Sequence, residues 1–282
     1  MSRIDSHHHF WHYSVQQYGW IQDHMAVLKR DFLPSDLVEA VSDTGITGVI
    51  SVQARQTVEE TEWLLSLAGG QNSIVDAVVG WVPLAAPDVQ AELERLTHDS
   101  RLRAVRHVVH DEPDDDFILG TEFNRGIETL KRYNLVYDIL IFGKHLRQTI
   151  KFVDQHPEQP FVLDHIAKPT IRAGKFDEEW AKLFKELAKR PHVSCKFSGV
   201  VTEVRDPSWT IDLLRPYWDT AWQAFGDGRL MYGSDWPVCL LRSEYQQWIQ
   251  TVEALSGGLS PTELQSFWSG AATKAYNLVS RG

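Results

Sequence analysis

Short apolar segments rich in β-branched residues alternate with amphipathic segments from one end of the chain to the other. The amphipathic segments have a helical period, and in one of them Trp180, Leu183 and Leu187 fall on a single apolar stripe. Several β-branched segments, such as 47–52, are apolar nearly throughout, which is typical of parallel strands buried on both faces. The pattern predicts eight strands, at residues 3–7, 46–54, 74–82, 102–109, 135–141, 160–165, 192–199 and 229–235.

Eight consecutive strand–helix units without a break in composition predict an α/β fold, a single (β/α)8 TIM barrel that spans residues 1–282. The alternative is a doubly wound open sheet, but no glycine-rich phosphate turn follows any predicted strand. In a barrel, the loops that follow the strands carry the chemistry. We therefore expect the active site near the long loops at 11–30, 111–119, 169–176 and 200–207.

Composition narrows the function classes. The net charge of −10 argues against nucleic acid or an anionic membrane as a partner, because both bind clustered Lys and Arg. No signal peptide or long uncharged apolar segment is evident, and two cysteines imply no disulfide framework. We expect a cytoplasmic protein that binds a small molecule. Trp218 and Trp222 could mark the face of a homo-oligomer, although helix packing explains them more simply.

The first predicted strand leads into three consecutive histidines, His7, His8 and His9, with Ile4 before them and Phe10 after them. Alternate residues of a strand point to the same face, so His7 and His9 project together while His8 points away. An expression tag has more histidines and no strand before it, and solvated histidines on a frayed terminus fit poorly with the apolar neighbours. The spacing therefore predicts a histidine pair that grips a divalent cation or a substrate oxygen.

Polar and aromatic residues also gather where the other predicted strands end. Buried charges cost several kcal/mol unless they are paired, so this gathering indicates a polar pocket. Asp235 has little reason to follow the last strand for packing, and it could ligate a metal, activate water, or both. Lys196 would either pair with Asp164 or Asp235 or bind the substrate. The residues at the strand ends are Gln53, Trp81, Arg106, Asp164, His165, Lys196, Ser198 and Asp235, and Asp138 lies inside the apolar fifth strand.

Strand alternation assigns neighbouring residues to opposite faces. It directs Arg106 inward and His107 outward, and we expect His107 and His110 to be structural or loop residues. Asp164 and His165 have opposite parity, so we expect Asp164 to orient a loop rather than take part in the chemistry.

The sequence resembles the amidohydrolase superfamily. The shared pattern is His7 and His9 on the first strand, His165 on a middle strand and Asp235 after the eighth strand. Longer matches resemble the lactonase branch of this superfamily, which contains sugar lactonases such as L-fuconolactonase and also 2-pyrone-4,6-dicarboxylate lactonase. These matches run through nearly the whole chain in the expected order, at residues 4–11, 105–107, 163–169, 196–199 and 232–237.

The resemblance implies that the protein hydrolyses a small sugar-acid lactone, of the L-fucono-, L-galactono- or L-rhamnono-lactone type, to the aldonic acid. Asp235 would take a proton from the attacking water and deliver it to the departing ring oxygen. His7, His9 and His165, or a cation that they hold, would polarise the carbonyl. The residues expected to contact the substrate are Trp11, Gln53, Trp81, Arg106, Lys196 and Trp236.

The candidate ligand residues indicate at most one metal ion. Binuclear members of the superfamily carry a bridging lysine or glutamate on the fourth strand and further histidines, whereas this chain offers Arg106 and Asp138 on its fourth and fifth strands. His7, His9 and Asp235 together with water describe an open catalytic site for one divalent cation such as zinc. The resemblance implies that the lactonase branch works with one such ion or with none.

Other functions fit parts of the same pattern. Related amidohydrolases decarboxylate small unsaturated acids with one metal, and a dicarboxylate lactonase would use several arginines, which Arg55, Arg106 and Arg205 could supply. A metal-dependent nuclease shares the His-x-His opening but conflicts with the acidic balance. A non-catalytic sugar-acid binding protein on the same barrel is the alternative outside enzymes.

Overall fold

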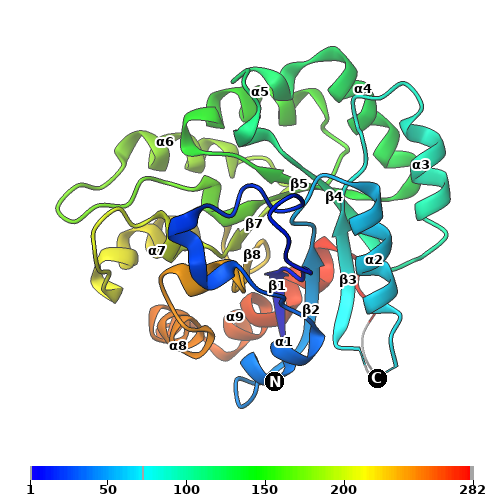
Figure 1. Ribbon diagram of the computed structural model, residues 1–282. Helices are drawn as coiled ribbons and strands as arrows, with labels where there is room; N and C mark the ends of the chain where they lie inside the picture. The colour runs from blue at the N-terminus through cyan, green and yellow to red at the C-terminus, as the bar shows by residue number, and fades with distance from the viewer. Residues whose placement is uncertain (1, 72, 280–282) are drawn as a thin grey trace.

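Eight strands form one parallel sheet in the order β1 to β8, so each strand pairs with its neighbour in the sequence. The computed structural model describes residues 2–71 and 73–279. Figure 1 shows the sheet at the centre, surrounded by helices. All eight predicted strands are present, most of them shorter than predicted: β1 Arg3–His8, β2 Ile46–Val52, β3 Val75–Gly80, β4 Leu102–Val108, β5 Val136–Leu140, β6 Phe161–Leu163, β7 Val193–Phe197 and β8 Leu230–Tyr232.

A helix connects each strand to the next, which gives the predicted (β/α)8 TIM barrel. Among the residues that the structure describes, no helix is long and apolar enough to cross a membrane. The helices are α1 Pro34–Ala40, α2 Val58–Ala68, α3 Val89–Leu96, α4 Thr121–Leu130, α5 Leu146–Gln155, α6 Glu178–Leu187, α7 Ile211–Phe225, α8 Tyr245–Ser256, α9 Pro261–Gln265 and α10 Ala271–Ala275.

The barrel closes where the chain beyond β8 meets the end of β1. The Asp235 amide donates to the His7 carbonyl at 2.7 Å, and the His9 amide donates to the Trp236 carbonyl at 2.7 Å. These bonds continue the parallel ladder past the last residue of β8. Closure therefore places the first and last motifs of the sequence side by side at the carboxyl ends of the strands.

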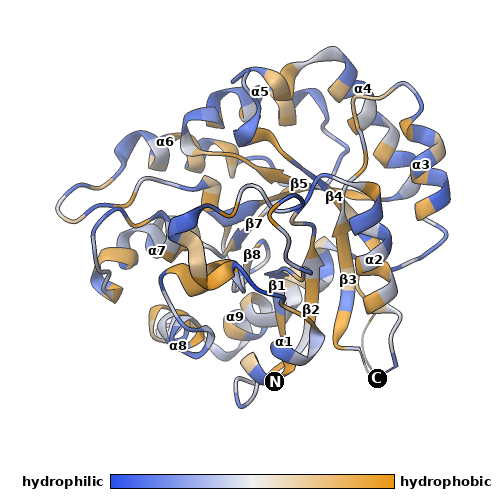
Figure 2. Ribbon diagram, in the orientation of Figure 1, coloured by the Kyte–Doolittle hydropathy of each residue, from blue (hydrophilic) through white to orange (hydrophobic). Residues whose placement is uncertain are grey.

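The apolar core has two layers, one between the sheet and the helices and one inside the barrel. The helices turn their apolar faces to the sheet (Figure 2), and Trp180 of α6 stacks on Phe184 with ring centroids 4.9 Å apart. Trp218 of α7 is buried against Phe267, at 5.1 Å, so its role is packing between elements. Inside the barrel, Tyr276, which directly follows α10, belongs to a cluster with residues of the strands.

Candidate active site

Two histidines and an aspartate converge at the seam where the barrel closes. His7 Nε2 lies 3.2 Å from His9 Nε2, and Asp235 Oδ1 lies 3.3 Å from His9 Nε2 and 3.7 Å from His7 Nε2. All three side chains are buried. His8 points the other way, with its Nε2 2.9 Å from the hydroxyl of Ser51, as strand alternation predicts.

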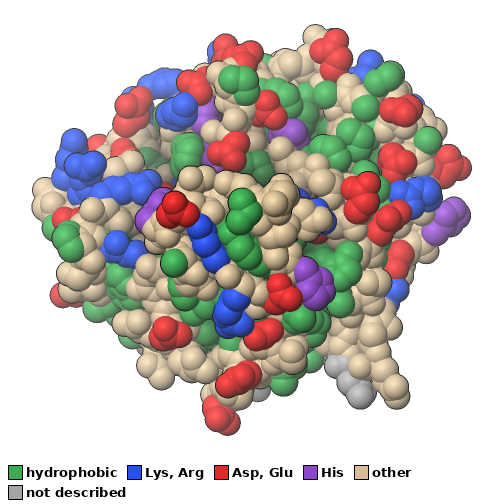
Figure 3. Space-filling model, viewed as in Figure 1, with side chains coloured by type: hydrophobic (Ala, Val, Ile, Leu, Met, Phe, Trp, Pro, Cys, Tyr) green, Lys and Arg blue, Asp and Glu red, His purple; other side chains and the backbone are tan. Residues whose placement is uncertain are grey.

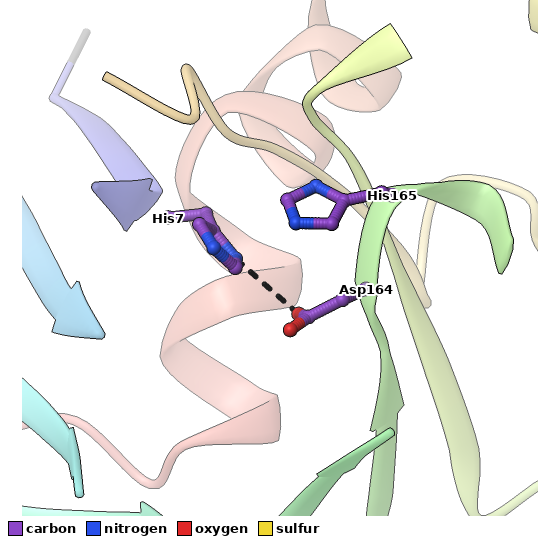
Figure 4. Close-up of side chains that lie close together, drawn as sticks. All are labelled: His7, Asp164 and His165. Carbon is purple, nitrogen blue, oxygen red and sulfur yellow. Dashed lines mark ion pairs between the residues drawn. The ribbon is translucent and has the colours of Figure 1, made fainter. Parts of the chain in front are cut away.

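His165 joins this group because the chain after β6 leaves the strand conformation. The four residues 165–168 all have positive φ, between 47° and 62°, which is rare outside glycine and recurs at functional sites. The ring of His165 lies 4.4 Å from that of His7, centroid to centroid, and its Nδ1 lies 2.8 Å from the hydroxyl of Ser198. Figure 4 shows His7, Asp164 and His165 facing one another.

The expectation that Asp164 merely orients a loop was wrong. β6 ends at Leu163, so the alternation on which that expectation rested stops one residue earlier. Asp164 Oδ1 lies 3.3 Å from His7 Nδ1, and Asp164 Oδ2 accepts a hydrogen bond from Arg106 at 3.0 Å. Asp164 therefore contacts the histidine cluster directly.

Glycine is required at one position beside the cluster. Gly199, with φ +61°, follows β7, and a Cβ atom there would lie 2.7 Å from both Asp235 Oδ2 and His165 Nδ1. Such contacts are shorter than any side chain tolerates, so the close approach of Asp235 and His165 depends on the missing Cβ. The sequence shows a glycine here, but only the fold shows what it accommodates.

A buried charge network lies beneath the histidines. Lys196 Nζ donates to Asp138 Oδ2 at 2.6 Å and lies 3.0 Å from Asp164 Oδ1. Tyr276 donates its hydroxyl to the same oxygen of Asp138 at 2.7 Å. Of the pairings considered for Lys196, the structure shows the one with Asp164 and adds Asp138, which is itself fully buried. Burial raises the pKa of Asp138 to about 6, although Lys196 lowers it.

Hydrogen-bond partners assign the tautomers of the two histidines on β1. The Val52 carbonyl lies 2.8 Å from His9 Nδ1, so Nδ1 carries the hydrogen and Nε2 has a free lone pair. Arg106 Nη1, which can only donate, lies 3.2 Å from His7 Nε2, and Asp164 Oδ1 lies 3.3 Å from His7 Nδ1, so His7 also carries its lone pair on Nε2. Two lone pairs and the Asp235 carboxylate thus point at one another, an arrangement that a cation between them would stabilise.

The spacing of these three ligand atoms fits a metal ion. Zinc bonds to nitrogen and oxygen are about 2.0–2.1 Å long, so two ligands of a tetrahedral site lie about 3.3 Å apart. The observed separations of 3.2, 3.3 and 3.7 Å among His7, His9 and Asp235 are close to that value. The residues therefore fit a single divalent cation with one coordination position left open.

At neutral pH the site combines the ionised Asp235 carboxylate with the neutral imidazoles of His7 and His165. Burial by itself raises the pKa of Asp235, but His165, His9 and His7 together hold it below its usual value. Burial lowers the pKa of His165 to about 4, and it lowers the pKa of His7 well below its ordinary range. Asp235 is therefore able to accept a proton from water at physiological pH.

A cavity of about 160 Å³ opens onto this group. Four of the predicted site residues line it, namely His9, Arg106, His165 and Asp235. The expectation that His110 is a structural or loop residue was incomplete, because His110 lies on the cavity wall. The other lining residues are Trp20, Ala54, Val108, Asp111, Leu140, Lys168 and Val238. Trp20 and Asp111 belong to loops that were expected near the site, whereas no pattern in the sequence indicated that the other five line a cavity.

Five of the six residues predicted to contact the substrate are not among the residues that line this cavity. Trp11 is fully buried and donates from Nε1 to the Arg30 carbonyl at 2.9 Å. The Gln53 amide donates to the Arg106 carbonyl at 3.4 Å. Trp81, Lys196 and Trp236 likewise are not among the lining residues, and of the six only Arg106 reaches the cavity.

The fold and the site define a barrel hydrolase with a histidine–aspartate centre at the carboxyl ends of its strands. The profile of the amidohydrolase family (Amidohydro_2) matches residues 4–278, and the chain belongs to this family. It is 40% identical to an L-fucono-1,5-lactonase of Burkholderia multivorans, over 98% of this chain and 96% of that protein. It is 23% identical to an L-rhamnono-gamma-lactonase of Scheffersomyces stipitis, over 70% of this chain and 67% of that protein.

Solved structures agree with this assignment. A crystal structure of an amidohydrolase from Burkholderia multivorans with bound zinc superimposes with a TM-score of 0.93 at 38% identity, covering 99% of this chain and all of that chain. A putative 2-pyrone-4,6-dicarboxylic acid hydrolase from Pseudomonas putida superimposes with a TM-score of 0.76 at 21% identity, covering 98% of this chain and 97% of that chain. The second likeness shows the shared fold alone.

Proposed function

We propose that the protein hydrolyses a small sugar-acid lactone to its aldonic acid, with L-fucono-1,5-lactone as the first candidate. The observation that carries this proposal is the Asp235 carboxylate at the wall of a small cavity, within 3.9 Å of the imidazoles of His7, His9 and His165. The 40% identity to an L-fucono-1,5-lactonase over nearly the whole chain supports the substrate class.

Asp235 acts as the base and then as the acid. It takes a proton from water as the water attacks the lactone carbonyl, and it gives the proton to the ring oxygen as the ring opens. A lactone is an activated ester, so a carboxylate base and a few donors suffice without a covalent nucleophile. His165 Nε2 lies 3.9 Å from Asp235 Oδ1, so water that contacts the carboxylate also lies next to the imidazole.

Arg106 and His165 stabilise the charge that develops on the carbonyl oxygen. Both line the cavity, and Arg106 is held in place by Asp164 at 3.0 Å and by the Gln53 carbonyl. Donors fixed in advance at a water-excluding site stabilise an oxyanion because they do not reorganise during the reaction. Ser198 fixes the orientation of the His165 ring through Nδ1.

His7, His9 and Asp235 are proposed to hold one divalent cation, with zinc as the first candidate. Such an ion would polarise the lactone carbonyl as a Lewis acid.

Other residues position the site without contacting the substrate. We propose that Lys196 holds Asp164, and through it His7, in place, because Lys196 is buried and pairs with both Asp138 and Asp164. Trp11 and Trp236 both pack against Phe32 and so support the loop wall.

A pH-indicator assay on chelator-treated protein, with and without added zinc, tests the function. We expect acid release from L-fucono-1,5-lactone above the spontaneous rate, and slower release from L-galactono- and L-rhamnono-lactones. Comparison of the two conditions determines whether the cation is required. No acid release from any of these lactones in either condition, together with turnover of 2-pyrone-4,6-dicarboxylate or carbon dioxide release from a dihydroxybenzoate, would refute the proposal.

The partner, cellular location and oligomeric state of the protein belong to the same proposal. The proposed partner is the lactone itself, and the predicted cytoplasmic location, homo-oligomer and lack of nucleic-acid binding stay predictions. Size-exclusion chromatography with light scattering tests the oligomeric state.

A further inference from the structure

A second, larger depression adjoins the active-site cavity and is lined by cationic side chains. A hollow of about 560 Å³ contains Lys144, Arg147, Lys168 and Arg205 in its lining, and Lys168 also lines the active-site cavity. A neighbouring hollow of about 650 Å³ shares Thr170, Asp177 and Glu179 with the first and adds further cations. We call the two hollows together the cationic groove, whose basic residues are Lys144, Arg147, Lys168, Arg172, Lys175 and Arg205.

The charge of the cationic groove is opposite to that of the whole protein. Six basic side chains face three acidic ones that line it, Asp177, Glu178 and Glu179, in a chain with a net charge of −10. Two more carboxylates pair with its cations: Glu203 with Lys168 and Arg205, and Asp115 with Lys144 at 2.6 Å. They bring the acidic total to five and leave an excess of one positive charge. Figure 3 shows Lys and Arg side chains gathered at the left edge of this face, over the loop between β6 and α6.

The basic side chains of the groove are incompletely neutralised. Lys168 and Arg205 share the single carboxylate of Glu203, at 3.0 Å each. Among the residues that the structure describes, Arg172 and Lys175 make no ion pair within 4.0 Å.

One further basic residue, Arg147, has Glu179 as its one ion-pair partner in the described part of the chain, at 2.9 Å, and exposed pairs of this kind exchange readily for another anion. These side chains are therefore available to a ligand that carries a carboxylate.

The proposed reaction converts a neutral substrate into a negatively charged product. This change of charge indicates which of the two molecules the cationic groove binds. A sugar-acid lactone is neutral, whereas hydrolysis yields a carboxylate with several hydroxyl groups and releases a proton. A cationic surface beside the cavity attracts the product and is indifferent to the substrate. We infer that the cationic groove binds the open-chain aldonate that leaves the active site, with Lys168 as the residue shared by the two sites. This inference rests on the proposed function.

Titration calorimetry with sodium L-fuconate tests the inference without requiring turnover. The groove variant is Arg172→Gln/Lys175→Gln. The matched control is Lys131→Gln/Arg132→Gln, which removes the same charge at residues that precede β5, at the opposite end of the barrel. We expect the groove variant to bind L-fuconate about tenfold more weakly at low salt and the control to bind as the wild type does. Binding in the active-site cavity is common to all three proteins, so the difference isolates the groove.

Further ligands establish which chemistry the groove recognises. Galactitol has the hydroxyls without the charge, and acetate has the charge without the hydroxyls, so both should bind more weakly than L-fuconate. Equal binding of L-fuconate by the groove variant and the wild type would overturn the inference, as would inorganic phosphate that binds as tightly as L-fuconate. Retained groove binding in a protein that does not hydrolyse the lactone would count against the proposed function alone.

Discussion

Replacing Lys196 with methionine tests how far the buried charge network holds the barrel together. Lys196→Met keeps the length of the side chain but removes the ammonium group, which lies 2.6 Å from Asp138 Oδ2 and 3.0 Å from Asp164 Oδ1. All three side chains are fully buried, so water cannot replace the lost partner. The variant leaves two carboxylates inside the barrel with fewer partners than before.

The structure sets the size of the effect. Removing one partner of a buried ion pair costs about 3–5 kcal/mol. Asp164 keeps Arg106 at 3.0 Å, and Asp138 keeps the Tyr276 hydroxyl at 2.7 Å, so we expect the lower end of this range. The free energy of unfolding should therefore fall by about 3 kcal/mol at pH 7, a large part of the 5–15 kcal/mol typical of a domain.

The pH dependence of the loss has a definite sign. Burial raises the pKa of Asp138 to about 6 in the wild type, above its unfolded value of 3.8, so its ionisation destabilises the fold as pH rises through this window. Without Lys196 the pKa of Asp138 rises further. In the variant, Asp138 therefore becomes protonated at a higher pH than in the wild type, and its protonation removes the cost of the unpaired charge. The difference in stability between variant and wild type is therefore largest in alkaline solution and shrinks as the pH falls toward 5.

Urea unfolding of both proteins at pH 8.5, 7 and 5.5 measures this difference. Lys131→Met is the matched control, because Lys131 makes only a 3.5 Å surface pair with Glu158 and should change stability by less than about 0.5 kcal/mol. Adding Asp138→Asn to Lys196→Met should restore part of the loss, since it removes the unpaired charge. A loss below about 1 kcal/mol, or one that grows on acidification, would refute the reasoning.

Three further changes test the site. Asp235→Asn should lower the rate of lactone hydrolysis about 10²–10⁴-fold with little change in the melting temperature, and near-wild-type turnover would remove Asp235 from its role. Tyr276→Phe should cost about 1 kcal/mol in urea unfolding because it removes a donor to Asp138, whereas Tyr137→Phe, whose hydroxyl has no partner among the described residues, should cost less; equal losses would contradict this assignment. Gly199→Ala should reduce both turnover and melting temperature, and a fully active, stable variant would show that the loop adapts to the added Cβ.

The barrel could be predicted from the sequence because its signal is repeated and local. Each buried parallel strand appears as a β-branched apolar segment, and the helical stripes between them recur, so errors at the ends do not change the number of units. The predicted ends are less accurate. The sixth strand was predicted at 160–165 but is Phe161–Leu163, because residues 165–168 adopt left-handed backbone conformations that no local pattern indicates.

The same limit applies to the candidate site. His9, His165 and Asp235 could be placed together because they end strands that a barrel brings to one face. The loop that carries Trp20 was expected near the site, but the individual loop residues that reach the cavity, such as Trp20 and Lys168, could not be predicted, since their position depends on tertiary packing. Trp11 was expected to contact the substrate, but aromatic side chains also pack the loops themselves, and Trp11 packs against Phe32.

Charge balance explains why Asp235 is the reactive carboxylate of this site. Asp138 and Asp164 are matched by Lys196 and Arg106, so that part of the network is neutral overall. Among the described residues, Asp235 has no lysine or arginine partner within ion-pair distance and contacts only histidines. The remaining negative charge therefore resides at the cavity wall, where a divalent cation, or the proton taken from water during hydrolysis, neutralises it.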